Sequence, residues 1–292
     1  MSGPITRGRR ALLAWYAPRA GAYPWRGVRD PYLVLVSEVM LQQTQASRVV
    51  PAYRSFVSRF PTVAALAAAP RADVLREWGS LGYPRRAVGL HETARAIVRE
   101  HDGVVPHEPS VLERLPGIGP YTAAAVASLG FGAAVPALDV NVRRVVGRVV
   151  LGRDDGAARE VRGAAERWID PASPAAWNQA LMDVGREHCR PRPRCDGCPL
   201  ARACRFRTNG VQPAPVRRRQ PPYEGSMRQL RGTILALLRG DGRVTFGSLV
   251  GKSGRSREEV RRALAGLVGD GLASAERSVL AGSPRGRVSL PR

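Results

Sequence analysis

The sequence predicts a mainly α-helical protein with a small α+β unit at its C-terminal end. Apolar residues recur three and four positions apart through most of the chain, whereas the alternation typical of strands is scarce before Arg243. Residues 208–226 are rich in proline and arginine and show no periodicity, so we expect a linker there. The 292 residues thus divide into a helical core over 1–207, the linker, and a separate unit over 227–292.

The helical pattern of the core is clearest in five segments, which are Pro31–Phe56, Val74–Val98, Tyr121–Leu129, Val140–Val150 and Trp177–Gly185. The most apolar stretch, Thr122–Leu138, is rich in glycine and alanine and stops at Asp139. We expect it to be buried in the core rather than to span a membrane.

The C-terminal unit combines helices with short strands. The pattern predicts first a helix over Met227–Arg239, a short strand over Arg243–Phe246 and a short helix through Leu249. A helix over Arg257–Val268 follows, and Ser256 and Glu259 form a capping box at its start. Two hairpin strands over Leu272–Glu276 and Arg287–Leu290 complete the unit. This order resembles a winged helix-turn-helix. The helix that carries Arg257, Arg261 and Arg262 would enter a DNA groove, or the wing would dock a protein, and the sequence leaves both open.

The chain has four cysteines, Cys189, Cys195, Cys198 and Cys204, spaced C-x5-C-x2-C-x5-C. No secretory segment is recognisable at the N-terminus, so we expect a cytoplasmic protein that keeps its thiols reduced. Four clustered thiols are then better interpreted as metal ligands than as disulfides. The spacing does not distinguish zinc from an iron–sulfur cluster.

Composition indicates a polyanionic partner and excludes one mechanism. Lysine and arginine number 46 against 24 acidic residues, a formal net charge of +22, and arginine neutralises phosphate with release of counterions. The only lysine is Lys252. A Schiff base needs an amine that can lose its proton, which arginine does not provide, so residues 1–251 offer no such nucleophile.

Two carboxylates and one glycine turn are the candidates for chemistry. Leu115–Gly119 contains two glycines one residue apart before a helix, an arrangement that exposes backbone N–H groups to a DNA phosphate or forms only a turn. Asp139 follows twenty residues after Gly119 and is a plain helix N-cap or also a functional carboxylate. The two roles are compatible, because capping amides favour the ionised form.

The second carboxylate is Glu38, within the segment Pro31–Gln45. On a helix, Val34 and Leu35 lie one turn before it and Leu41 follows, so burial would raise the pKa of Glu38. A protonated glutamic acid facing an ionised aspartate suits the cleavage of a glycosidic bond. The alternative is an exposed polar stripe of Glu38, Gln42 and Gln45.

The glycine hairpin, the downstream aspartate and the four-cysteine loop together resemble the helix-hairpin-helix DNA glycosylases of the endonuclease III superfamily, and among them the MutY-type adenine DNA glycosylases. The matching segments are Trp25-Arg26, Ser37–Gln45, Leu81–Tyr83, Leu115–Gly119, Tyr121–Ala123 and Leu138–Val142, within a likeness that spans Trp15–Arg205. The resemblance implies a two-lobed helical fold, with one lobe over 27–134 and the other from 1–26 and 135–207. It also implies a [4Fe–4S] cluster on the four cysteines, and removal of adenine opposite 8-oxoguanine or guanine in double-stranded DNA.

The resemblance also implies roles for single residues. Glu38 would protonate the adenine, Asp139 would stabilise the sugar cation, and Tyr121 and Asn141 would orient them. Residues implied to contact the flipped base or the duplex are Trp25, Arg26, Gln42, Gln43, Thr44, Leu81, Gly82, Tyr83, Gly117, Gly119 and Asp183. Bifunctional relatives carry a lysine where this chain has Tyr121, so we expect a glycosylase without lyase activity.

Three features depart from the family pattern. The Cys189–Cys195 interval has five residues where six are usual, Pro84 replaces a second tyrosine, and the segment after Ser226 is too short for a Nudix-like domain. Two other functions stay open. One is a thymine or uracil glycosylase acting on mispairs with guanine, and the other is a zinc-containing DNA-binding regulator without catalysis.

Overall fold

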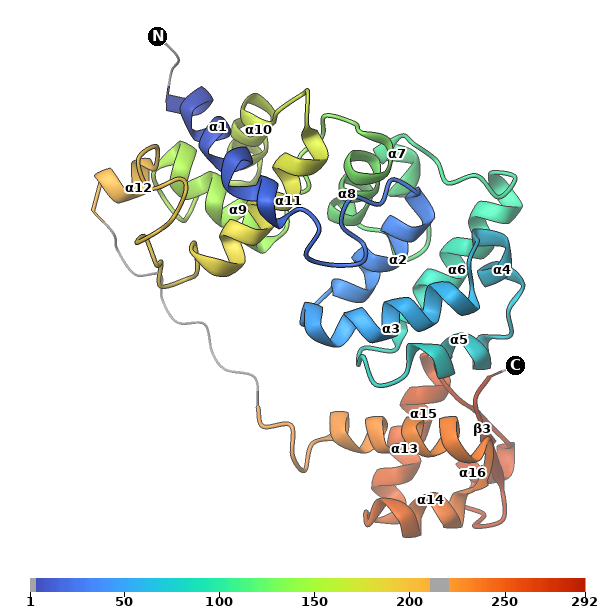
Figure 1. Cartoon of the computed structure of the whole chain (residues 1–292). Helices are drawn as coiled ribbons and strands as arrows, with labels where there is room; N and C mark the ends of the chain where they lie inside the picture. Colours follow the sequence, from blue (N-terminus) through green and yellow to red (C-terminus); the bar gives the residue numbers. More distant parts are fainter. Residues whose placement is uncertain (1–3, 211–220, 292) are drawn as a thin grey trace. The chain divides into compact units, whose positions relative to one another are not determined.

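The computed structural model describes residues 4–210 and 221–291, which form helices joined by short loops and one small sheet (Figure 1). Contacts divide the chain into two compact units, 1–38 with 105–218 and 39–104 with 219–292. The boundary falls inside α2 (Pro31–Leu41), directly after Glu38. The domain boundaries expected from the sequence stay a prediction, and most of the expected linker, residues 211–220, lies outside the described residues.

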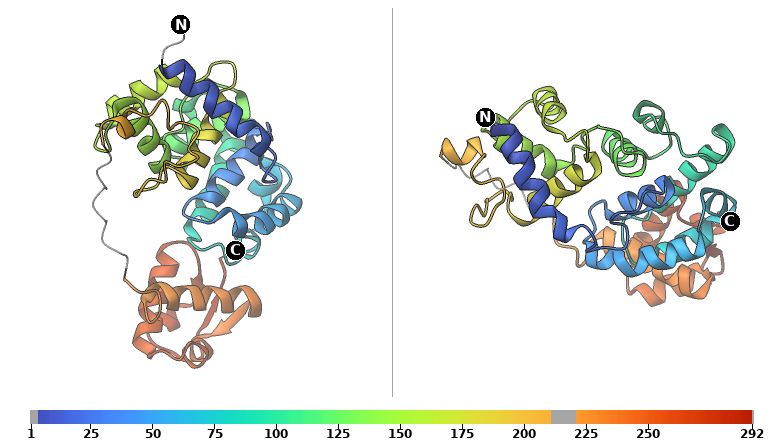
Figure 2. Two further views of the ribbon diagram at one scale, coloured as in Figure 1. Left: turned by 60° about the vertical axis from the view of Figure 1, so that its left-hand side comes forward. Right: turned by 45° about the horizontal axis from the view of Figure 1, so that its top comes forward.

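The first unit contains α1 (Pro4–Tyr16), a 3-10 turn (Ala17–Arg19), the first part of α2, α7 (Pro109–Leu112), α8 (Pro120–Phe131), α9 (Val140–Val146), a π-helical turn (Gly147–Leu151), α10 (Ala158–Trp168), α11 (Pro174–Glu187) and α12 (Arg205–Thr208). The helices α1 and α11 lie side by side in every view (Figures 1 and 2). They pack around Trp168 and Trp177, whose rings meet edge to face with centroids 5.6 Å apart. Burial of such aromatic and aliphatic surface stabilises this unit.

One buried amide fixes the segment that leads to Asp139. Asn178 of α11 is fully buried, and its Nδ2 donates to Ser128 Oγ at 2.8 Å and to the Val135 carbonyl at 2.9 Å. Its Oδ1 accepts from the Ala137 N–H at 2.8 Å. Since a buried polar group without partners costs about 1–3 kcal/mol, these bonds hold α8, α11 and residues 135–137 in one arrangement, two residues before Asp139.

The second unit begins with the end of α2 and continues through α3 (Ala46–Arg59), α4 (Val63–Ala68), α5 (Arg71–Trp78) and α6 (Arg85–Glu100). Two helices expected to be continuous are broken. The expected helix Pro31–Phe56 is interrupted after Leu41, where Gln43 has φ 55°, and Val74–Val98 is interrupted where Tyr83 has φ 47°. A positive φ cannot continue an α-helix, and side-chain periodicity carries no sign of it.

The C-terminal segment contains α13 (Met227–Asp241), β1 (Arg243–Thr245), α14 (Phe246–Ser253), α15 (Arg257–Gly269), β2 (Ser274–Ala275), α16 (Arg277–Leu280) and β3 (Arg287–Ser289). The strands form an antiparallel sheet in the order β1-β3-β2, which confirms the predicted hairpin. The predicted capping box at the start of α15 is present, with Ser256 accepting from the Glu259 N–H. Within the described residues these are the only strands.

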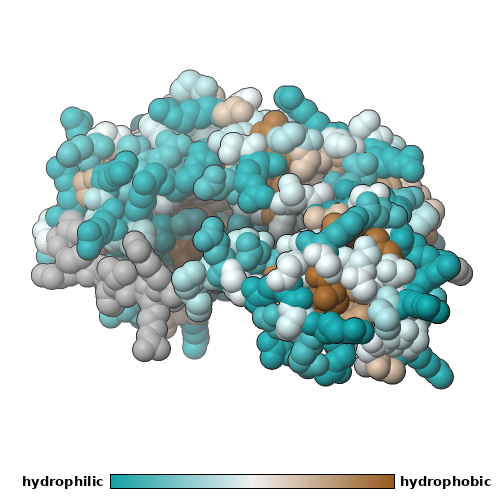
Figure 3. All heavy atoms as spheres, turned by 90° about the horizontal axis from the view of Figure 1, so that it is seen from below, coloured by the Kyte–Doolittle hydropathy of each residue, from teal (hydrophilic) through white to brown (hydrophobic). Residues whose placement is uncertain are grey.

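The described residues include no helix with both the length and the apolar character needed to cross a lipid bilayer. The face of the molecule drawn in Figure 3 is mostly hydrophilic, with small and separate apolar patches. The apolar stretch Thr122–Leu138 contributes buried core in its first part, since residues 122–129 of α8 are all buried, whereas Phe131, Gly132 and Ala134 are exposed.

Candidate active site

The first unit contains a buried glutamate, Glu38, at the end of its share of α2. Glu38 is 5% exposed, between the buried residues Val34 and Leu35 on one side and Tyr121 on the other. The Tyr121 hydroxyl donates to Glu38 Oε2 at 2.7 Å. Glu38 therefore does not belong to an exposed polar stripe.

Burial raises the pKa of Glu38, and the negative charge of Asp139 raises it further. The hydrogen bond from Tyr121 and the charge of Arg26 oppose that rise. Burial and Glu38 together raise the pKa of Tyr121 well above its ordinary value, so this hydroxyl stays a proton donor in its hydrogen bond. Glu38 is thus held in a setting that favours the protonated acid.

Asp139 is the N-cap of α9 and is less buried than Glu38. Its Oδ1 accepts from the Val142 N–H at 2.6 Å and its Oδ2 accepts from Asn141 Nδ2 at 3.1 Å. These bonds favour the ionised form, but desolvation outweighs them and raises the pKa of Asp139. Capping thus favours the ionised form, as expected, although the pKa of Asp139 stays above its ordinary value. Asp139 differs from Glu38 by the backbone N–H and the amide that donate to it.

The glycine hairpin stands directly before Tyr121. Gly117 has φ 77°, a conformation that disfavours other residues, and Gly119 is the N-cap of α8. Both glycines are exposed, while Leu115 and Ile118 are buried beneath them. The hairpin therefore presents backbone at the surface and sets the start of the helix that carries Tyr121.

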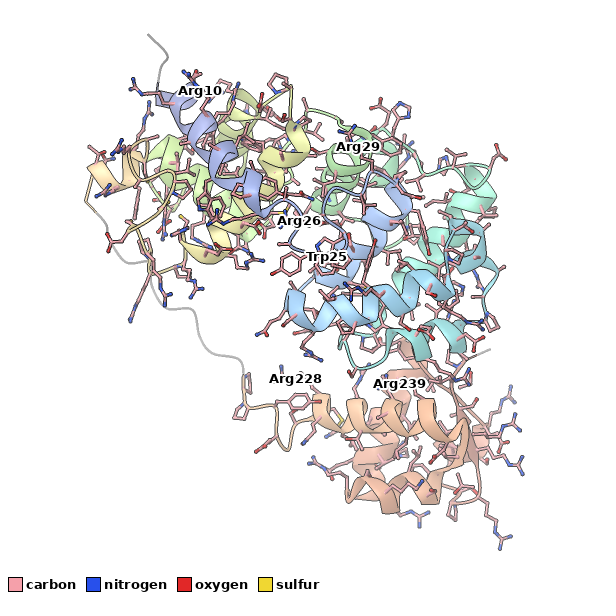
Figure 4. The ribbon with its side chains drawn as sticks, viewed as in Figure 1. Arg10, Trp25, Arg26, Arg29, Arg228 and Arg239 are labelled. Carbon is pink, nitrogen blue, oxygen red and sulfur yellow. The ribbon has the colours of Figure 1, made fainter. Side chains whose placement is uncertain are left out.

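Trp25 and Arg26 lie on the segment that joins α1 to α2 (Figure 4). Arg26 donates to Asp183 Oδ1 at 2.9 Å and to the Tyr16 hydroxyl at 3.0 Å, and both side chains of the ion pair are less than one-tenth exposed. Trp25 is buried and stacks on Tyr23 with ring centroids 5.2 Å apart. Because Arg26 also lowers the pKa of Glu38 and Tyr121, this ion pair belongs to the same site.

A second arginine, Arg144, fixes the side chain of Asn141 by a hydrogen bond. Arg144 donates to Asn141 Oδ1 at 2.7 Å, to the Gly185 carbonyl at 3.0 Å and to the Cys189 carbonyl at 2.5 Å. A side chain at Gly185 would place its Cβ 2.7 Å from that of Asn141. Close packing of α9 on α11 thus requires glycine at this position, and it fixes the amide that contacts Asp139.

The four thiols line one pocket, together with Arg148, Leu200 and Phe206. Arg148 is almost fully buried and donates to both carboxylate oxygens of Asp154 and to the carbonyls of Arg190 and Pro191. Its Nη1 lies 3.6 Å from Cys189 Sγ. A set of four sulfur donors beside a buried cation fits an anionic iron–sulfur centre. Within the described residues, no three His, Cys, Asp or Glu side chains converge closely enough to hold a single metal ion.

The remaining sequence candidates occupy two turns of the second unit. Gln42, Gln43 and Thr44 follow α2, and Leu81, Gly82 and Tyr83 precede α6. Gln43 and Tyr83 are both exposed and both have positive φ. Exposed residues with a strained backbone conformation are typical of functional segments.

Arg86 ties these two turns together, and sequence reasoning missed it. Its guanidinium donates to the carbonyls of Val39, Met40, Gln42 and Gly82 and to Thr44 Oγ1. It also lies over the Tyr83 ring, 5.4 Å from the centroid. Burial lowers the pKa of Arg86 to about 10, and its charge persists at neutral pH. In a chain with this much arginine, composition gives no signal that would single out Arg86 or Arg148.

The structure therefore brings six predicted residues into one cluster, which are Glu38, Tyr121, Asp139, Asn141, Arg26 and Asp183. Trp25, the hairpin glycines and the four cysteines belong to the same unit of the chain. The turns around Gln43 and Tyr83 belong to the second unit.

Comparison with known proteins gives consistent relatives. Residues 36–171 match the family model described as "HhH-GPD superfamily base excision DNA repair protein". The adenine DNA glycosylase of Mycolicibacterium smegmatis is 47% identical over 233 residues, covering 78% of this chain and 79% of the relative.

Two solved structures share the fold. A thermostable thymine-DNA glycosylase superposes with a TM-score of 0.66 at 27% identity, over 71% of this chain and 98% of its own. An endonuclease III trapped as a covalent intermediate with DNA superposes with a TM-score of 0.59 at 25% identity, over 72% of this chain and 99% of its own.

We expect Arg86→Lys to loosen both turns of the second unit. An ammonium group has three donors at one point and cannot replace a planar guanidinium that spans several carbonyls. The free energy of unfolding should fall by about 1–3 kcal/mol, and amide hydrogen exchange should quicken at residues 39–44 and 79–84. Urea unfolding and exchange measured by mass spectrometry check this. Arg54→Lys, at an exposed position of α3, is the matched control, and unchanged exchange in both turns would contradict the assignment.

Proposed function

Because the chain belongs to the HhH-GPD superfamily of base excision DNA repair proteins, and within it to the adenine DNA glycosylases, we propose that it removes adenine from DNA by hydrolysis of the N-glycosidic bond. The observation that carries this proposal is the buried contact between Tyr121 and Glu38, beside the capped carboxylate Asp139. It supplies an acid and a carboxylate in different settings, which glycosidic cleavage requires.

In the proposed reaction, Glu38 would act on the leaving adenine and Asp139 on the deoxyribose. Glu38, kept protonated by burial, gives its proton to the adenine ring as the glycosidic electron pair moves onto the base. Asp139 carries the negative charge that stabilises the cation left at C1′ of the deoxyribose. Asn141 and Tyr121 hold the two carboxyl groups, and water completes the reaction at C1′ to leave an abasic site.

We propose that the product is not cleaved further by a Schiff-base lyase step. Tyr121 occupies the helix start after the hairpin, and its hydroxyl is already committed to Glu38. The only lysine, Lys252, pairs with Asp241 at 2.6 Å in the C-terminal segment.

We propose further that the adenine is mispaired with 8-oxoguanine or guanine in double-stranded DNA. Exposed Gln43 and Tyr83, held by Arg86, are placed on strained turns from which they could enter the duplex beside a flipped base. Arg26 and Asp183 would meet the base at the entrance to the site, and the exposed amides of the hairpin at Gly117 and Gly119 would bind a phosphate.

The four cysteines would hold a [4Fe–4S] cluster. When bound, such a cluster cross-links the loop through four iron–sulfur bonds. Arg148 would act on the loop directly, since it binds the carbonyls of Arg190 and Pro191 within the shortened Cys189–Cys195 interval. Zinc is the alternative metal.

The C-terminal segment would form a winged helix-turn-helix domain over 227–292, after the linker 208–226 and the core 1–207. The element order α13-β1-α14-α15-β2-α16-β3, with the strands in one antiparallel sheet in the order β1-β3-β2, supports this proposal. A cytoplasmic location beside the chromosome would follow from the proposed substrate.

One solved relative favours a second candidate function. The thymine-DNA glycosylase with a TM-score of 0.66 shares the fold, which makes removal of thymine or uracil opposite guanine the alternative. The 47% identity to an adenine DNA glycosylase favours adenine.

We expect Glu38→Gln to lose base release while it still binds DNA. Gln keeps the shape of the side chain but has no acidic proton, so the single-turnover rate should fall by about 100-fold or more. Strand scission after alkali, on duplexes with A·8-oxoG, A·G, A·C, T·G and U·G, measures this and reports the preferred mispair. Glu166→Gln, at an exposed position of the same unit, is the control. Release of thymine or uracil but not adenine would replace this proposal with the alternative.

The pH dependence of base release tests the two carboxyl groups. Release requires Glu38 protonated and Asp139 ionised. Because the pKa of Glu38 is raised, the rate should fall as pH rises through that value, and because the pKa of Asp139 is raised, the rate should fall as pH drops through it. Tyr121→Phe removes a bond that lowers the pKa of Glu38, so the alkaline limb should move to higher pH. Single-turnover rates across pH check this, with exposed Tyr223→Phe as control. An alkaline limb that stays in place would contradict the role of Tyr121.

Metal analysis tests the cysteine pocket. The purified chain should be brown and contain iron and inorganic sulfide, and Arg148→Lys should lose iron to a chelator faster, since a lost outer contact weakens metal affinity by about 10–100-fold. Visible absorption and iron content measure both effects, with exposed Arg159→Lys as control. A colourless chain that carries zinc would exclude the cluster.

A further inference from the structure

The C-terminal segment is strongly basic, but several arginines on and near its helix α15 are already paired within the segment. Residues 227–291 contain twelve lysine and arginine residues against five carboxylates. On α15, however, Arg261 donates twice to Glu258, at 2.9 and 2.7 Å. Two carboxylates in the first turn of a helix would repel DNA phosphates from that end. The helix expected to enter a groove is thus partly neutralised by its own sequence.

Neighbouring arginines of α15 are also engaged within the segment. Arg255 pairs with Glu259 at 2.6 Å, and Arg257 donates to the Gly282 carbonyl at 2.9 Å. To bind a DNA phosphate, these arginines would first have to break their contacts within the segment, which reduces the free energy gained on binding. The remaining arginine of α15, Arg262, is exposed, and its charge acts on Glu258. We therefore look for further positive charge outside α15.

The sheet presents a different surface. The register pairs Arg243 with Ser289, and Thr245 with Arg287, and it pairs Ser274 with Ser289 on the other edge. Successive residues of a strand face opposite sides, and the intervening Val244 and Val288 are buried. The outer side of the sheet therefore carries two arginines and three hydroxyl groups. We name this the arginine face.

The guanidinium groups of the arginine face are available for a ligand. Arg243 and Arg287 are exposed, and the described part of the chain gives neither side chain a carboxylate partner. They are diagonal neighbours on one face, about 7–8 Å apart at their backbones. Arg285, also exposed, lies two residues before Arg287.

The backbone beneath these arginines is firmly held. Gly286, between Arg285 and Arg287, accepts from the Phe246 N–H at 2.9 Å, and an added Cβ would lie 2.7 Å from atoms of Ser278 and Val279. The Arg287 N–H donates to Glu276 Oε2 at 2.9 Å. This carboxylate is thus bonded to backbone rather than to a guanidinium. A fixed backbone reduces the ordering cost of binding.

We propose that the arginine face of the β1-β3-β2 sheet binds the phosphate backbone of double-stranded DNA, as a contact additional to that of the glycosylase core. This inference rests on the proposed function, since the same DNA would engage both. The one carboxylate beside this face, that of Glu276, is bonded to the Arg287 N–H. The two guanidinium groups and the hydroxyl groups match phosphate oxygens, and a contact of this kind carries no base sequence. Two linked contacts hold one duplex more tightly than either does alone.

The test is the salt dependence of DNA affinity in the full chain. Binding of an undamaged duplex is measured by fluorescence anisotropy for the unmodified chain and for the double variant Arg243→Gln with Arg287→Gln. Loss of two phosphate contacts should weaken binding at every sequence tested and reduce the slope of log K against log salt by about 2. Gln keeps most of the aliphatic stem, and thermal unfolding confirms that the variant is folded.

A second double variant, Arg261→Gln with Arg262→Gln, removes the same charge from α15. The proposal expects it to retain most of the affinity and of the slope. Equal losses from both variants, or a loss confined to the α15 variant, would overturn the arginine face in favour of helix binding or of general charge. Wild-type affinity in the sheet variant would overturn it as well.

Base release separates this inference from the proposed function. If the unmodified chain binds DNA through the sheet but releases no adenine from any mispair, the proposed function fails and the arginine face stands. If it releases adenine while the sheet variant binds as tightly as the unmodified chain, only the arginine face fails.

Discussion

The removal of one carboxyl group, that of Glu38, from water is the constraint on which the rest of the site depends. A buried carboxylate is costly unless donors surround it, so burial favours the protonated acid. The apolar face of α2 provides the burial, and α8 brings Tyr121 into contact. Asn178 does not contact Glu38, but its hydrogen bonds fix α8 against α11 and thereby the position of Tyr121 on α8.

The two carboxyl groups differ both in their burial and in their hydrogen bonds. Desolvation raises the pKa of both, yet Asp139 accepts from the Val142 N–H and from Asn141, whereas Tyr121 is the donor that meets Glu38. The additional donors favour the ionised form of Asp139. Each charge raises the cost of the other, so the two groups titrate as a coupled pair.

The sequence predicted what depends on periodicity and on motifs, and it failed where backbone geometry or packing decides. The helices around Tyr121 and Trp177, the Ser256 capping box and the strand at Arg287 are confirmed. The breaks at Gln43 and Tyr83 were not foreseen, because a positive φ in a polar or aromatic residue leaves no trace in an apolar pattern. The turns there depend on Arg86, which donates to five acceptors that lie up to 47 positions away.

Arginine has two separate uses in this chain, and the distinction explains why charge alone is a poor guide to its sites. Arg86, Arg144 and Arg148 are wholly or partly buried and donate to backbone carbonyls that no helix satisfies, a task suited to a planar group with five donors. Such residues are cations in the formal charge but are not available to DNA. Arginines that lack an internal acceptor are the first candidates for contacts with DNA phosphates. The net charge of +22 therefore overstates the attraction for a polyanion, and its effective part must be found residue by residue, from the hydrogen bonds that each guanidinium already makes.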